Sequence, residues 1–207
     1  KYFKNKFKIY LISASSVKEK GSNIKLISLK NYSFVNIKNA VSQIPKKNTV
    51  FLFLNGSYDD QPFYKISNKK IQEIIKINLT LPLLATKTVL NFNISNKNKF
   101  IYFSSSRALK GDLGIAVYSA TKTALNGLVR SFTQEYSNLD QEFYLFSLGL
   151  FKGGMESKLT EKVRKKLIDQ TPNKKNVNKN DLIKTLKLIL NSSALTGSTI
   201  KLDNGYS

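Results

Sequence analysis

Short apolar runs of strand length alternate along this chain with longer segments of helical periodicity. Residues 50–54 (VFLFL) are five consecutive apolar residues, and in residues 99–103 (KFIYF) four consecutive apolar residues follow Lys99. Continuous rather than alternating hydrophobicity is typical of parallel strands that are buried on both faces. The order of strands and helices therefore predicts an α/β fold: a Rossmann-like, doubly wound parallel sheet with helices on both faces.

The predicted elements extend over the whole chain as one domain, residues 1–207, without an internal repeat or a long linker. Strands are expected at 7–13, 23–29, 50–54, 99–103, 142–148 and 199–202. Helices are expected at 35–44, 69–92, 118–136, 161–168 and 181–190. We expect the long helix over 69–92 to be adjusted near Pro82, and residues 171–180, rich in Lys and Asn, to form a mobile surface loop.

Two residue types are missing from the chain, and their absence narrows the chemistry. Without Cys there is neither a disulfide framework nor a thiolate metal site, and without His the commonest metal ligand and general base are gone. We therefore predict no metal site. Acid/base chemistry in this chain has to use Tyr, Lys, Asp or Glu.

The net charge of +21 allows two interpretations. One is a surface that binds nucleic acid or a membrane. The other is a composition bias: 31 of the 34 basic residues are Lys, and they are scattered beside 21 Asn, as in an AT-rich coding sequence. A nucleic-acid surface usually clusters its charge and favours Arg, so we favour the second interpretation. No run of 18 apolar residues occurs, so we expect no membrane span and a cytoplasmic location.

Tyr118 and Lys122 form a Tyr-x-x-x-Lys pair that is informative only in its context, since Tyr2 and Lys6 have the same spacing. Tyr118 lies near the start of a predicted helix, so Lys122 falls on the same helix face. Ser105, thirteen residues earlier, ends a predicted strand. Strand ends and the helices that follow them meet at the carboxyl edge of a parallel sheet, where open α/β folds bind ligands.

Asn78 is a further candidate, because a polar amide within an apolar helical stretch needs hydrogen-bond partners. Each candidate also has a purely structural interpretation. Ser105 could be a helix cap or turn residue, with Ser104 and Ser106 as competitors for its role. Asn78 could cap a kink near Pro82, and Tyr118 could be a packing residue.

Taken in order, these segments resemble the short-chain dehydrogenase/reductase family, most closely its 3-oxoacyl-carrier-protein reductase branch. Ser-Ser-Ser, a 13-residue gap and then Tyr-Ser-Ala-Thr-Lys is similar to the catalytic segment of that family. Four other stretches resemble family motifs in the same order: 50–57 (VFLFLNGS), 77–79 (INL), 147–155 (SLGLFKGGM) and 195–206 (LTGSTIKLDNGY). The resemblance covers essentially the whole chain.

The resemblance implies roles for four residues. Tyr118 would exchange a proton with the oxygen of a carbonyl or alcohol, and Ser105 would orient that oxygen. A free Tyr has a pKa of about 10, and we expect the Lys122 ammonium to lower that of Tyr118. Lys122 would also hold the nicotinamide ribose, and Asn78 would hold a water that links Lys122 to solvent.

The resemblance also implies a nicotinamide cofactor. Its expected contacts are Asn55, Gly56, Tyr118, Lys122, Gly149 and Phe151. The strand that ends at residues 13–16 is followed by Lys18 and Lys20, with no acidic residue placed to bind a ribose 2′-hydroxyl. This favours NADP(H) over NAD(H).

Several positions depart from the family pattern. The first strand and the Gly-rich turn Thr-Gly-x-x-x-Gly-x-Gly are absent, so we expect an N-terminally incomplete domain that binds cofactor poorly by itself. Ser28 stands where the family often has Asp, Leu148 replaces a Pro, and Gly153 replaces a Thr.

Three functions compete on the sequence alone. The first is an NAD(P)-dependent oxidoreductase that interconverts a carbonyl and a secondary alcohol, with a small or carrier-protein-linked substrate such as a 3-oxoacyl thioester. The second is a non-catalytic, truncated relative that serves as a subunit or scaffold, and the third is a basic nucleic-acid-binding protein. We rank them in that order, and expect the intact protein to be a homotetramer or homodimer.

Overall fold

The computed structural model of this chain describes residues 9–13, 24–151 and 159–207. The chain divides into two compact units. One holds residues 1–47 and 83–94, and the other holds residues 48–82 and 95–207. The expectation of a single domain over residues 1–207 therefore stays a prediction.

The first unit contains a two-stranded parallel sheet and a short helix. Strand β1 (Ile9–Ser13) pairs with β2 (Ile24–Ser28). Helix α1 (Phe34–Val41) begins after Ser33, whose side chain accepts a hydrogen bond from the N–H of Asn36 and so caps the helix. The buried residues of α1 recur at helical spacing: Ile37, Ala40 and Val41. This confirms the helix predicted over residues 35–44.

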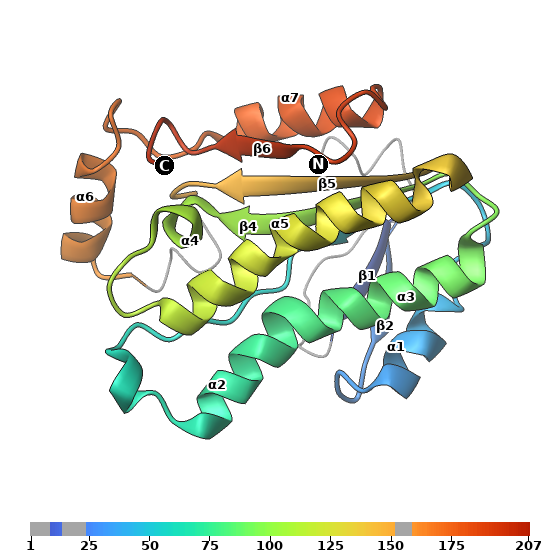
Figure 1. The fold of residues 1–207 in the computed structure, drawn as a ribbon, viewed down its shortest axis with the longest axis horizontal. Coiled ribbons are helices and arrows are strands. Elements are labelled where there is room, and N and C mark those ends of the chain that lie inside the picture. Colours follow the sequence, from blue (N-terminus) through green and yellow to red (C-terminus); the bar gives the residue numbers. More distant parts are fainter. Residues whose placement is uncertain (1–8, 14–23, 152–158) are drawn as a thin grey trace. The chain divides into compact units, whose positions relative to one another are not determined.

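The second unit is built on a four-stranded parallel sheet, which confirms the predicted α/β class (Figure 1). Its strands lie side by side in the order β3 (Thr49–Phe53), β4 (Asn98–Ser105), β5 (Gln141–Leu148) and β6 (Thr199–Leu202). All four were predicted, because buried parallel strands keep their apolar residues in uninterrupted runs.

Aromatic side chains set the register of this sheet. Phe51, Phe100 and Phe143 are aligned across three neighbouring strands. Their rings stack with centroid separations of 5.3 Å between the first two and 4.9 Å between the last two. Phe100 and Phe143 are fully buried. A one-residue slip would move these rings to the opposite face, so their burial specifies the pairing.

Helices cover both faces of the sheet in the second unit. Helix α5 (Ala116–Tyr136) runs along one side of β4 and β5, and α7 (Lys179–Leu190) lies on the other side (Figure 1). The short helix α4 (Ser106–Lys110) follows β4 directly, and α6 (Glu161–Asp169) follows residues 152–158, which lie outside the described part of the chain. All but α4 were predicted from the sequence.

The predicted long helix over 69–92 exists, and its adjustment lies just before Pro82. It comprises α2 (Asn68–Ile75), a π-helical segment (Lys76–Thr80) and α3 (Leu81–Asn93). In the π segment the N–H of Leu81 bonds to the carbonyl of Lys76, five residues back. Pro82 has no N–H for the carbonyl four residues earlier, so the wider hydrogen-bond spacing is a local response to proline.

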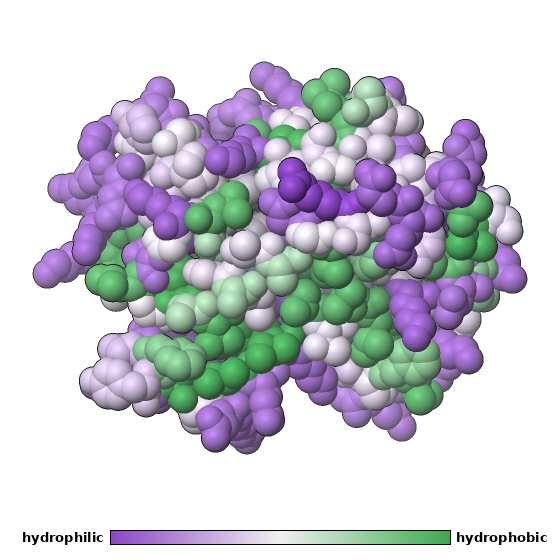
Figure 2. All heavy atoms as spheres, in the orientation of Figure 1, coloured by the Kyte–Doolittle hydropathy of each residue, from purple (hydrophilic) through white to green (hydrophobic). Residues whose placement is uncertain are grey.

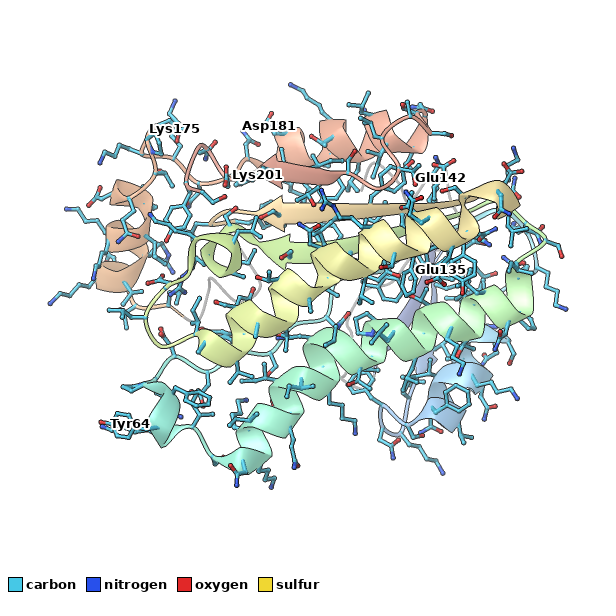
Figure 3. All side chains as sticks on the ribbon, in the orientation of Figure 1. Tyr64, Glu135, Glu142, Lys175, Asp181 and Lys201 are labelled. Atoms are coloured by element: carbon cyan, nitrogen blue, oxygen red, sulfur yellow. The ribbon has the colours of Figure 1, made fainter. Side chains whose placement is uncertain are left out.

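The hydrophilic residues do not form one continuous patch on the face of the molecule shown in Figure 2. Hydrophilic residues are scattered over the face shown in Figure 2 rather than gathered on one element. Glu142 lies at the start of β5 (Figure 3), where its carboxylate accepts hydrogen bonds from Lys99, Tyr144 and Ser193. Within the described residues, no helix is long and apolar enough to cross a bilayer, and no three His, Cys, Asp or Glu side chains gather to hold a metal.

Candidate active site

A cavity of about 600 Å³ lies at the carboxyl ends of β3, β4 and β5 in the second unit. Its walls are mostly apolar and include Leu54, Phe103, Ile115, Leu148, Leu150 and Leu186. Seven of the eight residues predicted for the site line it: Asn55, Gly56, Ser105, Tyr118, Lys122, Gly149 and Phe151. The eighth, Asn78, is not in the wall. The volume lies within the range of about 300–1,000 Å³ that is usual for small-molecule sites.

The structure distinguishes Ser105 from the two serines beside it. The Ser104 hydroxyl donates to the carbonyl oxygen of Lys122 at 3.0 Å, and the hydroxyls of Ser106 and Ser147 are 3.3 Å apart. Both neighbours are buried. Ser105 lines the cavity, and although it precedes α4 its side chain makes no cap hydrogen bond. Ser104 also borders the cavity, but its hydroxyl is taken by the carbonyl oxygen of Lys122, so Ser105 is the serine of the three whose hydroxyl is left for a ligand.

Tyr118 lies in the first turn of α5, and its phenol forms a side-chain hydrogen bond with Ser105. The ring is 8% exposed and meets the ring of Tyr58 edge-on, with centroids 6.2 Å apart. Burial raises the pKa of Tyr118 above its ordinary value of 10. The Ser105 hydrogen bond and the positive charge of Arg107 oppose that rise.

This direction corrects the expectation that the Lys122 ammonium lowers the pKa of Tyr118. Lys122 is 3% exposed, and its Nζ donates to the carbonyl oxygens of Phe103 at 2.8 Å and Asn55 at 3.1 Å. The ammonium is thus held by the ends of β4 and β3 rather than by the phenol. Burial lowers the pKa of Lys122 itself from 10.5 to about 8.

Asn78, in the π-helical segment, is fully buried, and its side-chain amide makes three hydrogen bonds within the protein. Its Oδ1 accepts from the N–H of Ser57 at 2.8 Å. Its Nδ2 donates to the carbonyl oxygen of Ser57 at 2.8 Å and to Oγ1 of Thr121 at 3.0 Å. Both amide protons are taken by protein acceptors, so the side chain of Asn78 braces the loop after β3 against α5, and the water link to Lys122 stays a prediction.

Replacement of Asn78 by Leu is expected to lower the free energy of unfolding by about 1–3 kcal/mol, because it leaves the half-buried N–H of Ser57 and the buried hydroxyl of Thr121 without their partner. Urea unfolding followed by circular dichroism measures this loss. Asn91→Leu, at an exposed position of α3, is the matched control and should change stability by less than about 0.5 kcal/mol. Equal losses in the two variants would contradict the bracing role.

Gly149 and Phe151 lie on the loop after β5, which is tied to neighbouring backbone. A Cβ on Gly149 would come within 2.7 Å of the Cα of Asp203, so this close approach requires glycine. Phe151 forms a parallel bridge with Val177, which is buried. Residues 172–175 of the expected loop are exposed, but its first residue, Thr171, and Val177 are anchored in the protein. Gly153 lies outside the described residues.

Sequence reasoning missed four residues of the site and its supports. Tyr58, Arg107 and Tyr206 line the cavity. Thr121 links Asn78 to the backbone of Tyr118, to whose carbonyl oxygen it donates at 2.8 Å. Arg107 carried a usable signal, since it is one of three Arg in a chain with 31 Lys and lies two residues after Ser105. Nothing in the local sequence marks Tyr58 or Tyr206.

Comparisons with known proteins agree with this geometry. Residues 12–164 match the family model described as short chain dehydrogenase. A 3-oxoacyl-acyl-carrier-protein reductase of Aquifex aeolicus is 27% identical over 159 residues, which cover 75% of this chain and 62% of the relative. The chain therefore spans less than two thirds of that relative. The reductase of the same name from Rickettsia felis is 23% identical over 198 residues, covering 94% of this chain and 81% of the relative.

Solved structures show the same fold at low sequence identity. The structure described as ElxO with NADP bound has a TM-score of 0.87 at 17% identity, covering 99% of this chain and 90% of that one. The structure of 4-hydroxyisoleucine dehydrogenase complexed with NADH has a TM-score of 0.85 at 17% identity, covering 100% of this chain and 90% of that one. Both likenesses confirm the Rossmann-like architecture.

Proposed function

This chain belongs to the short chain dehydrogenase family, and we propose that it interconverts a carbonyl and a secondary alcohol with a nicotinamide cofactor. The observation that carries the proposal is the pairing of the Ser105 and Tyr118 hydroxyls in one mostly apolar cavity, with the Lys122 ammonium in the same wall. The carbonyl oxygen gains negative charge during reduction. A hydrogen bond from Ser105 and a proton from Tyr118 would both stabilise that charge.

The residues present fit the nicotinamide end of such a cofactor. An ammonium has three donors, and two carbonyl oxygens take two of those on Lys122, so a third can serve a ribose hydroxyl. Asn55, Gly56, Gly149 and Phe151 border the same cavity and would hold the nicotinamide. When bound, the reduced cofactor supplies the hydride that the carbonyl carbon accepts.

Tyr118 would deliver the proton in this reaction. Because burial raises its pKa above 10, the phenol is protonated near neutral pH and is ready to donate to the carbonyl oxygen. Ser105 donates a hydrogen bond to the same oxygen and fixes its position. The product is a secondary alcohol: its carbon has gained the hydride, and its oxygen has gained the proton of Tyr118.

The substrate class and the preference between NADP(H) and NAD(H) are further parts of the proposal. The names of the curated relatives favour a 3-oxoacyl thioester, carried on a protein or a smaller thiol. Related structures bind NADP in one case and NADH in another, so they do not favour either cofactor. The preference for NADP(H) still rests on Lys18 and Lys20, which lie outside the described residues. Assembly as a homotetramer or homodimer also remains a proposal.

Replacement of Ser105 by Ala tests the proposal. We expect kcat for reduction of a neutral 3-oxoacyl thioester to fall about 10–100-fold, because a hydrogen bond to a developing charge is lost. The assay follows oxidation of NADPH and NADH at millimolar concentration. Ser131→Ala, at an exposed position on α5, is the matched control. The proposal fails if neither cofactor is oxidised by wild type, or if the two variants keep equal rates.

A further inference from the structure

The charged groups in the cavity wall are all cationic. Among the described residues that line it, Arg107 and Lys122 carry charge, and none is Asp or Glu. Lys122 is committed to two backbone carbonyls on the side where Asn55 and Gly56 lie. Arg107 is therefore the other cation of the described wall that a ligand in the cavity could meet.

Arg107 is held in place by an ion pair that leaves part of its guanidinium available. Its Nε and Nη2 both approach Oδ2 of Asp112 at 2.8 Å, and Oδ1 of Asp112 accepts from the N–H of Leu113 at 2.8 Å. A guanidinium has five N–H donors in a planar fork, and the Asp112 oxygen engages only two of them. The Arg107 side chain keeps 22% of its surface exposed.

The rest of the wall suits an apolar ligand body. Ile115 lies seven residues after Ala108 and packs with it and Tyr118 in one buried cluster. Tyr206 closes the cavity near α6, with its hydroxyl donating to Gln170 at 3.2 Å. A ligand that fills this cavity contacts apolar side chains on most sides, so its main body is expected to be apolar. Because the remaining Lys122 donor is assigned to the cofactor ribose, Arg107 is the cation of the described wall that is left for the substrate.

We propose that Arg107 is a specificity residue that binds an anionic group of the substrate, so that this chain prefers a free oxo acid with an apolar chain to the neutral thioester that the names of the relatives favour. A carboxylate matches the planar fork of a guanidinium better than a neutral ester or amide does. The inference rests on the proposed function, because Ser105 and Tyr118 would engage the ketone while Arg107 engages the carboxylate.

The first test compares 3-oxohexanoate with 3-oxohexanamide, which has the same shape and no charge. Wild-type protein should reduce the carboxylate with a kcat/KM at least about tenfold higher, as expected for a hydrogen bond between charged partners. A ratio near one in wild type overturns the inference, even if both compounds are reduced and the proposed function holds.

Variants assign the preference to Arg107. Arg107→Gln should bring the ratio of the two kcat/KM values close to one, whereas Arg107→Lys, which keeps the charge, should retain a preference for the carboxylate. Arg130→Gln removes the same group from an exposed position on α5 and should leave the ratio unchanged. Because a poorly folded variant loses both rates together, the ratio reports the charge. A wild-type ratio in Arg107→Gln overturns the inference.

A binding measurement without cofactor separates this inference from the proposed function. Hexanoate and hexanamide are titrated into the protein, and shifts of backbone amide signals in the NMR spectrum are followed. Hexanoate should bind wild type about tenfold more tightly than hexanamide, and Arg107→Gln should abolish that difference. Failure of the protein to reduce any compound would overturn the proposed function. Equal binding of hexanoate and hexanamide would overturn the role of Arg107.

Discussion

Replacement of Tyr118 by Phe is expected to lower kcat for carbonyl reduction by about 10²–10⁴-fold, because it removes the proton donor and keeps the ring. The edge-on contact with Tyr58 and the burial of the ring survive the change, so the fold should persist. The measurement is the rate of NADPH or NADH oxidation at saturating substrate, together with a thermal unfolding curve that checks the fold.

Tyr64→Phe is the matched control for this result. Tyr64 is 82% exposed and is labelled in Figure 3 at the edge of the molecule, outside the cavity wall. Tyr64→Phe also removes one phenol hydroxyl, but at the surface. Its kcat should differ from that of wild type by less than about twofold, as expected for a surface substitution. Equal rates in Tyr118→Phe and wild type would remove Tyr118 from the chemistry and leave the cavity as a binding site only.

The dependence of rate on pH gives a second reading of Tyr118. Reduction needs the protonated phenol, so its rate should fall as pH rises through the pKa of Tyr118. Because burial raises that pKa, the fall should come at higher pH than the titration of a free phenol. The reverse oxidation needs the phenolate and should speed up over the same range. Both limbs should be absent from the residual activity of Tyr118→Phe.

Replacement of Lys122 by Met is expected to change how stability depends on pH. The pKa of Lys122 falls from its ordinary 10.5 to about 8 on folding, because the ammonium is buried. Below pH 8 both states bind the proton, and the folded state carries the full cost of burying the charge. Between about pH 8 and 10.5 the unfolded chain binds more protons, so the free energy of unfolding rises with pH, by up to about 3 kcal/mol in all.

Urea unfolding at several pH values between 7 and 10.5 measures this effect as a difference between proteins. The free energy of unfolding of wild type minus that of Lys122→Met should rise with pH, because the variant lacks the titrating amine. The contributions of the tyrosines are common to both proteins and cancel. Lys165→Met, an exposed lysine on α6, should follow wild type throughout. A difference that stays flat with pH would mean that Lys122 is not buried as a charge between the carbonyl oxygens of Asn55 and Phe103.

The sequence by itself determined the main elements and their order, and it predicted the main candidates for the site. Residues 50–54 and 100–103 are continuous apolar runs because strands covered on both faces need apolar side chains on both of them. Helix α5 was readable from its apolar positions, and Ser105, Tyr118 and Lys122 from their spacing around a strand end and a helix start. These are local patterns, with periods of two or 3.6 residues, so they survive without knowledge of packing.

Only the tertiary structure decided which atoms meet. The amide of Asn78 bonds to Thr121, 43 residues away, and the ammonium of Lys122 bonds to Asn55, 67 residues away. The sequence predicted that Asn78 would hold a water and that the charge of Lys122 would act on the phenol of Tyr118. It did not identify Arg107. Such partners depend on how helices and loops pack across the sheet, and burial then sets the sign of each pKa change. No local period in the sequence encodes either one.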